Sequence, residues 1–262
     1  NSLTKTSSPQ KNKKTIFIWP EGILPNISKD QLKEYKFLFE NEFNENHILT
    51  IGINDIKKES QIIKYFNSLT IYNHNLEILN SYNKVNLVPF GEFLPFEKIL
   101  SLIGLKTITN NYQSYSRGEK RNIIEVNKIN FSVRLLPLIC YEIIYSGNIF
   151  NSRDFDFIVN ISEDGWFGHS IGPHQHFAHS IYRAIESGKY VLRSANNGIT
   201  AIINPLGVVE KQVGLNKSGF VDLFETKKVE PTIFSKYGNK IFIIIILMYI
   251  FLIFSFNRIN NE

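Results

Sequence analysis

The chain has 262 residues, of which 43% are hydrophobic, and it carries a net charge of +5. This length allows one large α/β domain or two small ones with a sizeable core, and no linker divides the chain. The lysines are scattered and form no basic stripe with interleaved aromatic residues, so we do not expect nucleic-acid binding. The single cysteine excludes an intramolecular disulfide bond.

In the first half of the chain, the sequence pattern predicts helices that lie between short strands. Residues 1–14 are polar, and we expect them to be disordered. A short apolar strand over Thr15–Ile18 leads into the loop Trp19-Pro20-Glu21-Gly22. Ser28 is a candidate N-cap for a helix over 29–44, because apolar side chains recur there at helical spacing. The other elements predicted here are strands over 48–54, 61–72, 76–78 and 85–88 and a short helix over 95–103.

The second half of the chain alternates strands with one well-delimited helix. Pro173 suits the first turn of a helix over 173–187, and Gly188 suits its end. This succession of elements predicts a mixed sheet covered by helices, in an α/β sandwich. The predicted strands cover 123–126, 130–139, 155–161, 190–194, 199–203 and 208–213, and the last three form a meander.

An uncharged apolar run lies near the C-terminus. Residues 241–254 contain no charge, glycine or proline, and Lys240 and Arg258 flank the run. Extended to Phe256, the run covers roughly 24 Å as a helix, and snorkelling of the flanking basic residues makes up the difference from a hydrocarbon core of about 30 Å. A buried core helix is the alternative. Because the run is apolar on every face, we predict a transmembrane helix over 240–256, whose balanced flanking charges leave its orientation open.

Three segments carry residue types that suit nucleophilic catalysis. Cys140 ends an apolar run, and Glu142 follows two residues later. A thiol at its ordinary pKa of about 8.5 is mostly protonated at neutral pH, so it needs a base or a cation to activate it. Glu21 is a candidate base, and Lys84 is a candidate partner of the thiolate or of an oxyanion. Glu142 is a candidate to orient Lys84 or a substrate.

Each of these residues alone also fits a plain structural role. Glu21 suits a surface turn, Lys84 a solvated lysine, Glu142 a structural ion pair, and Cys140 a small buried apolar side chain. Only their joint placement beside β-like runs predicts a Glu-Lys-Cys site.

The loop after the next strand is a candidate pocket wall. Residues 160–168 include Trp166 and two glycines, although an ordinary turn with a packed tryptophan fits equally. His174 and His176 are expected on different sides of a helix, and the HExxH arrangement is absent, so we expect no metal. The sequence carries no P-loop or dinucleotide fingerprint, and we expect no cofactor.

Five motifs occur in the order found in one known family. They are Trp19-Pro20-Glu21-Gly22, Lys84 with Val88-Pro89-Phe90-Gly91-Glu92-Phe93-Leu94-Pro95, Ile139-Cys140-Tyr141-Glu142, Asp164-Gly165-Trp166-Phe167-Gly168 and Asn196-Asn197-Gly198-Ile199-Thr200. In these motifs the chain resembles the bacterial apolipoprotein N-acyltransferases, the membrane-bound branch of the nitrilase superfamily. The resemblance runs from about Thr15 to the terminal apolar run, and the Pro-Phe-Gly-Glu and Cys-Tyr-Glu segments are specific to that branch.

The resemblance implies a nitrilase-like α-β-β-α sandwich over 15–235, followed by the transmembrane helix. It places this catalytic domain on the periplasmic side of the bacterial inner membrane. It also implies a catalytic triad of Glu21, Lys84 and Cys140, with Glu92, Tyr141, Glu142 and Trp166 as supporting or substrate-binding residues.

The resemblance further implies a lipid-to-protein acyl transfer. Glu21 takes the thiol proton, and the thiolate attacks the sn-1 ester of a phospholipid, usually phosphatidylethanolamine. Lys84 and the backbone N–H of Tyr141 stabilise the oxyanion. The α-amine of the diacylglyceryl cysteine of an apolipoprotein then attacks the thioester. A thioester is reactive enough to acylate an amine, which favours cysteine over serine.

The chain departs from the family pattern in three places. The membrane helices that precede the domain in the family are not found, and neither is the first strand of the sandwich, upstream of Trp19. We therefore expect a C-terminal fragment or a split gene product. Glu163 stands where the family usually has Asn, a change expected to alter the pocket loop.

Two alternatives remain open at this point. A soluble nitrilase-type amidase explains Glu21, Lys84 and Cys140 but not the terminal apolar run. An inactive, truncated membrane-anchored domain is the other alternative. Retention of all three triad residues argues against loss of catalytic function, although a recently truncated chain would still contain them.

Overall fold

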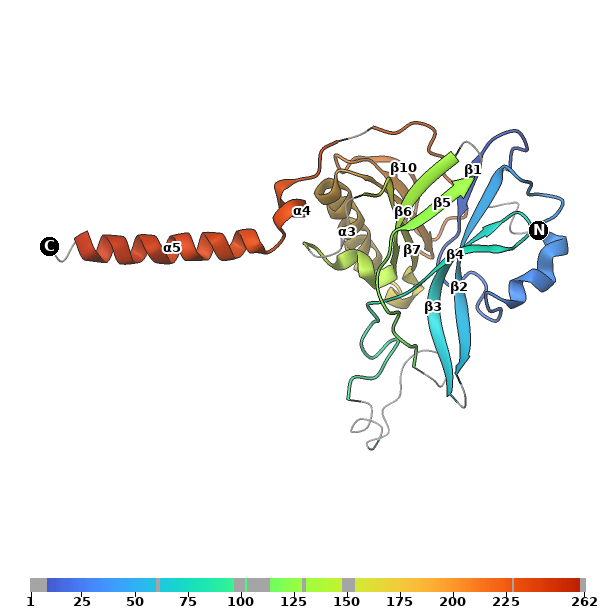
Figure 1. The fold of residues 1–262 in the computed structure, drawn as a ribbon, viewed down its shortest axis with the longest axis horizontal. Helices are drawn as coiled ribbons and strands as arrows, with labels where there is room; N and C mark the ends of the chain where they lie inside the picture. Colours follow the sequence, from blue (N-terminus) through green and yellow to red (C-terminus); the bar gives the residue numbers. More distant parts are fainter. Residues whose placement is uncertain are drawn as a thin grey trace.

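Two β-sheets form the centre of the computed structural model (Figure 1), which describes residues 9–59, 62–96, 102, 114–128, 131–147, 154–227 and 229–259. In the first sheet β1 is parallel to β2 and the other neighbours are antiparallel. In the second sheet β6, β7 and β8 are parallel and the outer strands antiparallel. The first sheet has the order β1 (Thr15–Ile18), β2 (His47–Glu59), β3 (Ile62–Asn73) and β4 (Ile78–Asn83). The second has the order β10 (Val209–Val213), β9 (Thr200–Ile203), β8 (Tyr190–Asn196), β7 (Phe157–Glu163), β6 (Phe131–Ile139) and β5 (Ile124–Lys128).

Alternation of side chains along the strands produces four layers. Leu135 of β6 packs with residues of the first sheet in the core between the sheets. Its neighbour Leu136 faces the opposite side, where it packs with Phe177 of helix α3 (Gly172–Ser187). On the outer face of the first sheet, Leu49 packs with Phe39, which follows the short helix η1 (Gln31–Leu38). This layering confirms the predicted nitrilase-like α/β architecture.

The predicted helix over 29–44 is much shorter in the structure. Only η1, a 3-10 helix, forms there, and the following residues make turns. Ser28 does not act as its cap, because its backbone N–H and hydroxyl both donate to the Gln31 side chain. The apolar residues at helical spacing nevertheless pack inward, and Leu32 and Phe39 are buried. The spacing therefore predicted the buried face correctly and the helix length wrongly.

The predicted strand over 85–88 does not form. The N–H groups of Val85 and Asn86 donate to the buried Glu142 carboxylate rather than to a neighbouring strand. The predicted strand over 48–54 is instead longer, because β2 pairs with β3 along its whole length. Most of the predicted helix over 95–103 lies outside the described residues.

Helix α3 matches its prediction closely. Pro173 lies in its first turn, and Gly188 ends it in the left-handed conformation at φ +64°. A Cβ atom at Gly188 would come within 2.6 Å of the Val229 carbonyl oxygen, so only glycine fits there. The meander predicted after the helix is also confirmed, as β8, β9 and β10 are antiparallel neighbours.

The terminal apolar run forms helix α5 (Lys240–Ile259), which follows the short helix α4 (Ile233–Tyr237). Figure 1 shows α5 projecting away from the sandwich, and its apolar side chains are exposed, among them Phe251 and Phe254. Within the described residues, no helix meets the length and apolarity needed to span a membrane, so the transmembrane prediction is not confirmed. The domain limits 15–235 and the disorder of residues 1–14 stay predictions.

Candidate active site

Cys140 occupies a strained turn where β6 ends and the short helix η3 (Cys140–Ile144) begins. Its φ angle is +47°, in the left-handed region that costs a non-glycine residue about 1–2 kcal/mol. The residue is half-buried. The sharp turn therefore presents the thiol at the edge of the second sheet.

Two buried residues from the first sheet carry the opposite charges of the site. Glu21 follows β1, and Lys84 directly follows β4. The side chain of Lys84 is only 1% exposed, and its ammonium lies 2.9 Å from Glu92 Oε1 and 3.7 Å from Glu21 Oε1. The structure therefore brings Glu21, Lys84 and Glu92 together.

Hydrogen bonds hold this charge cluster in place. Asn67 of β3 donates from Nδ2 to Glu21 Oε1 at 2.5 Å and to Glu92 Oε1 at 2.9 Å. The other Glu21 oxygen accepts from the backbone N–H of Glu163 at 2.8 Å. Glu92 Oε2 accepts from the N–H of Val88 at 2.9 Å. Both carboxylates are thus fixed by the protein rather than by solvent.

The electrostatics of the three candidate triad residues are coupled. Burial raises the pKa of Glu21, and the charge of Lys84 opposes that rise. Burial would lower the pKa of Lys84, but the charges of Glu21, Cys140 and Glu92 raise it above its usual value. Burial and the charge of Glu21 raise the pKa of Cys140 to about 12, although Lys84 lowers it. The thiol is therefore protonated at neutral pH, and attack requires a base to remove its proton.

Glu142 lies beside the site but does not contact Lys84 in any hydrogen bond that the structure gives it. Its carboxylate is fully buried. It accepts bonds from the Tyr82 hydroxyl, from Arg121, and from the N–H groups of Val85, Asn86 and Ile139. The hypothesis that Glu142 orients Lys84 directly is therefore replaced by an indirect one, in which it fixes the backbone that follows Lys84.

The remaining two candidate residues are Tyr141 and Trp166. The ring of Tyr141 packs edge-on against Tyr145, with centroids 5.6 Å apart. Trp166, in the short helix η4 (Asp164–Phe167), is 60% exposed and so lies at the surface of the loop. Glu163 accepts from Gly165 N and from the side chains of Asn196 and Asn197, which ties this loop to the end of β8.

A buried polar network that the sequence did not predict contacts the backbone of Cys140. Asp164 is held by Arg193, His176 and Ser162, and His176 also contacts the backbone carbonyl of Cys140. From the sequence, His176 had been weighed only as a metal ligand. No group of three or more His, Cys, Asp or Glu residues in the described part of the chain suits a metal, and the absence of a metal requirement stays a prediction.

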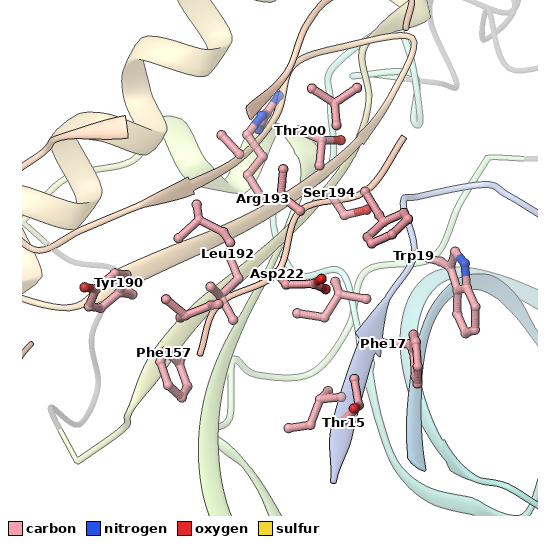
Figure 2. Close-up of a pocket in the computed structure, with 18 of the residues that line it drawn as sticks. Thr15, Phe17, Trp19, Phe157, Tyr190, Leu192, Arg193, Ser194, Thr200 and Asp222 are labelled. Carbon is pink, nitrogen blue, oxygen red and sulfur yellow. The ribbon is translucent and has the colours of Figure 1, made fainter. Parts of the chain in front are cut away.

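A cavity of about 1210 Å³ opens between the two sheets next to the site. Figure 2 shows Phe17 of β1 and Trp19, which follows this strand, on one side and Leu192 and Ser194 of β8 on the other. Glu21, Lys84 and Cys140 are not among its lining residues. We therefore do not assign a substrate to this cavity.

Comparison with known proteins supports the resemblance seen in the sequence. An apolipoprotein N-acyltransferase of Rickettsia prowazekii is 35% identical over 251 residues, which cover 94% of this chain and 49% of that protein. One from Rickettsia bellii is 41% identical over 208 residues, covering 79% and 40%. The chain thus spans about half the length of the curated relatives it matches.

Solved structures support the fold. A CN-hydrolase superfamily protein of Xanthomonas campestris superposes with a TM-score of 0.53 at 15% identity, covering 79% of this chain and 76% of that one. The nitrilase-superfamily protein Nit3 of Saccharomyces cerevisiae gives a TM-score of 0.52 at 17% identity, covering 77% and 73%. The model of the carbon-nitrogen hydrolase family matches residues 7–222. The chain therefore belongs to the carbon-nitrogen hydrolase family, and within it is similar to the apolipoprotein N-acyltransferases.

Proposed function

We propose that this chain carries an N-acyltransferase site that moves a phospholipid acyl chain through a Cys140 thioester to the α-amine of a diacylglyceryl cysteine in an apolipoprotein. The observation that carries the proposal is the buried pair of Glu21 and Lys84, whose charges both act on the Cys140 thiol. The relatives' name supports the choice of acyl transfer over hydrolysis.

In the first half-reaction Glu21 takes the proton of the Cys140 thiol as sulfur attacks the ester carbonyl. The raised pKa of Glu21 suits a base that must later return this proton. Lys84 and the backbone N–H of Tyr141 bind the oxyanion of the tetrahedral intermediate. The C–O bond then breaks, Glu21 gives its proton to the leaving alkoxide, and a lysophospholipid and the thioester result.

In the second half-reaction the α-amine of the acceptor attacks the thioester carbonyl. Glu21 takes a proton from the amine nitrogen, the C–S bond breaks, and the thiolate regains a proton from Glu21. The amide and the free Cys140 thiol are the products. Cysteine suits this role because a thioester reacts with amines more readily than an oxygen ester does.

The supporting residues have distinct proposed roles. Glu92 balances the charge of Lys84 and holds its ammonium at 2.9 Å. Glu142 holds the backbone after Lys84, Tyr141 supplies the oxyanion N–H, and the exposed Trp166 contacts the lipid donor or the acceptor peptide.

The proposed role of helix α5 is to hold the domain at the membrane. We propose that its exposed apolar side chains insert into the bacterial inner membrane, with the catalytic domain on the periplasmic side and phosphatidylethanolamine as the donor. Phe242→Lys combined with Ile246→Lys would place two charges in the apolar helix. This variant should no longer float with phosphatidylethanolamine-containing vesicles, whereas unchanged flotation would contradict the insertion of α5.

The acyl transfer is tested by intact-mass spectrometry of the detergent-solubilised chain after incubation with phosphatidylethanolamine. We expect an acyl adduct that hydroxylamine removes and that Cys140→Ala lacks. Glu21→Gln should slow its formation by about 10²- to 10⁴-fold, the usual contribution of a general base. An adduct that then disappears on addition of a diacylated lipopeptide, with acylation of its amine, supports transfer. Release of free fatty acid to water instead would favour a hydrolase, and no adduct at all would refute the proposal.

A further inference from the structure

His176 links the nucleophile to a buried ion pair. Its ring, 4% exposed, comes from helix α3, and Nε2 lies 3.1 Å from the carbonyl oxygen of Cys140. A carbonyl oxygen only accepts hydrogen bonds, so Nε2 carries the hydrogen in this contact. A histidine of α3 therefore holds the backbone carbonyl of the proposed nucleophile by a hydrogen bond.

The other ring nitrogen of His176, Nδ1, contacts the buried ion pair of Asp164 and Arg193. Nδ1 lies 2.9 Å from Asp164 Oδ1, and Arg193 donates to Asp164 Oδ2 at 2.7 Å. Burial alone would raise the pKa of Asp164, but the hydrogen bond from His176 and the charge of Arg193 lower it to about 2. The carboxylate is thus ionised at neutral pH. Together with Arg193 Nη2, which lies 3.2 Å from Nδ1, it holds the Nδ1 edge of the ring, so that Nε2 faces the Cys140 carbonyl.

Arg193 is anchored in turn on the second sheet. Its Nη1 contacts Asn160 Oδ1 of β7, and its Nε donates to the Ile199 carbonyl at 3.2 Å. All of these groups are buried, so solvent does not replace any of them. The ring orientation is therefore fixed by β7, β8 and α3 together.

Holding the Cys140 carbonyl also sets the direction of the Tyr141 N–H, because both belong to one peptide group. The described peptide bonds are trans, so the carbonyl of Cys140 and the N–H of Tyr141 point in opposite directions within one plane. Tyr141 is the second residue of η3, and N–H groups in the first turn of a helix lack acceptors within it. Holding the carbonyl toward α3 therefore aims the Tyr141 N–H away from α3.

We propose that His176 is a positioning residue that fixes the Cys140–Tyr141 peptide and so aims the Tyr141 N–H at the oxyanion. This inference rests on the proposed acyl transfer, because the N–H matters only if a tetrahedral oxyanion forms at Cys140.

The test compares two reactions of the same thiol. Acylation by a p-nitrophenyl ester passes through an oxyanion, whereas alkylation by iodoacetamide does not. The amide of His176→Gln reaches about as far as Nε2 and retains a donor for the carbonyl, whereas that of His176→Asn reaches only as far as Nδ1. His174→Asn, on the exposed face of the same helix, is the matched control.

We expect His176→Asn to lower the acylation rate by at least about 10-fold, and by no more than the 10²–10³-fold that loss of one oxyanion donor costs. His176→Gln should recover most of this loss, His174→Asn should match wild type, and the alkylation rate should change less than about 3-fold throughout, because alkylation needs no oxyanion donor. Unchanged acylation in His176→Asn, a parallel fall of both reactions, or no recovery in His176→Gln would overturn the inference.

The same experiment separates this inference from the proposed function. A wild-type chain that the p-nitrophenyl ester acylates and phosphatidylethanolamine does not would refute the proposed donor and leave the role of His176 standing. A wild-type chain that the activated ester does not acylate has no working oxyanion site, and the inference would fall.

Discussion

Replacing Lys84 by methionine removes the positive charge between two buried carboxylates while keeping a side chain of similar length. The Lys84 ammonium lies 2.9 Å from Glu92 and 3.7 Å from Glu21, and all three side chains are buried. Breaking a buried ion pair by removing one partner costs about 3–5 kcal/mol. For a domain of this size such a loss lowers the Tm by about 6–20 °C. We expect this drop for Lys84→Met at pH 8.

The deficit of Lys84→Met should depend on pH in a defined direction. In wild type, burial raises the pKa of Glu21 and Lys84 opposes that rise. Without Lys84 the folded-state pKa of Glu21 moves further above its unfolded value, so the folded chain binds the proton more tightly than the unfolded chain. Stability gained in this way is present at low pH and is lost as pH rises through the folded pKa. The Tm difference from wild type should therefore shrink between pH 8 and pH 5.

Thermal denaturation followed by near-UV circular dichroism at pH 8, 6.5 and 5 checks both expectations. The double variant Lys84→Met/Glu92→Gln serves as a control, because it removes one carboxylate together with the cation. It should recover part of the Tm at pH 8 without recovering thioester formation. A Tm for Lys84→Met that equals wild type at pH 8, or a drop of the same size at all three pH values, would refute the reasoning.

Two further predictions concern Cys140 itself. Cys140→Gly should be about 1 kcal/mol more stable than Cys140→Ala in urea denaturation, because glycine adopts φ +47° without the left-handed penalty; equal midpoints would argue against backbone strain at this turn. Because burial and Glu21 raise the thiol pKa to about 12, alkylation of wild-type Cys140 by iodoacetamide should keep accelerating from pH 7 to pH 10, and a plateau near pH 8.5 would contradict the raised pKa.

The elements that the sequence predicts well are those with local signals at both ends. Helix α3 is delimited by Pro173 and Gly188, whose backbone preferences act without help from the rest of the fold. The length of β2 has no such signal, because its polar second half is held by pairing with β3, as in the Lys57–Lys64 pair. The loop after Lys84 has strand-like composition, yet the buried Glu142 takes its N–H groups instead.

The proposed reactive groups could be selected from the sequence, whereas some of the residues that hold them in place could not. Glu21, Lys84 and Cys140 each stand next to an apolar run, and this placement is visible in the sequence. Asn67 offers only a weak signal, as a buried amide inside an otherwise regular strand, and its bonds to Glu21 and Glu92 depend on the folded sheet. Because other histidines stand close to His176 in the sequence, it was weighed only as a metal ligand and not as a donor to a backbone carbonyl.

The two sheets divide the chemistry between them, and this division explains what positions the site. The first sheet supplies the proposed base and cation, Glu21 and Lys84, while the second supplies the proposed nucleophile Cys140, whose carbonyl contacts His176 of α3. The bond from the N–H of Glu163 to Glu21 joins the two directly. Because the pKa of the thiol is raised to about 12, the base must lie close enough to remove its proton, and a displacement of about 1 Å would slow this step. Under the proposed mechanism the apolar core between the sheets therefore acts on catalysis as well as stability, since it sets the separation of the proposed base and nucleophile.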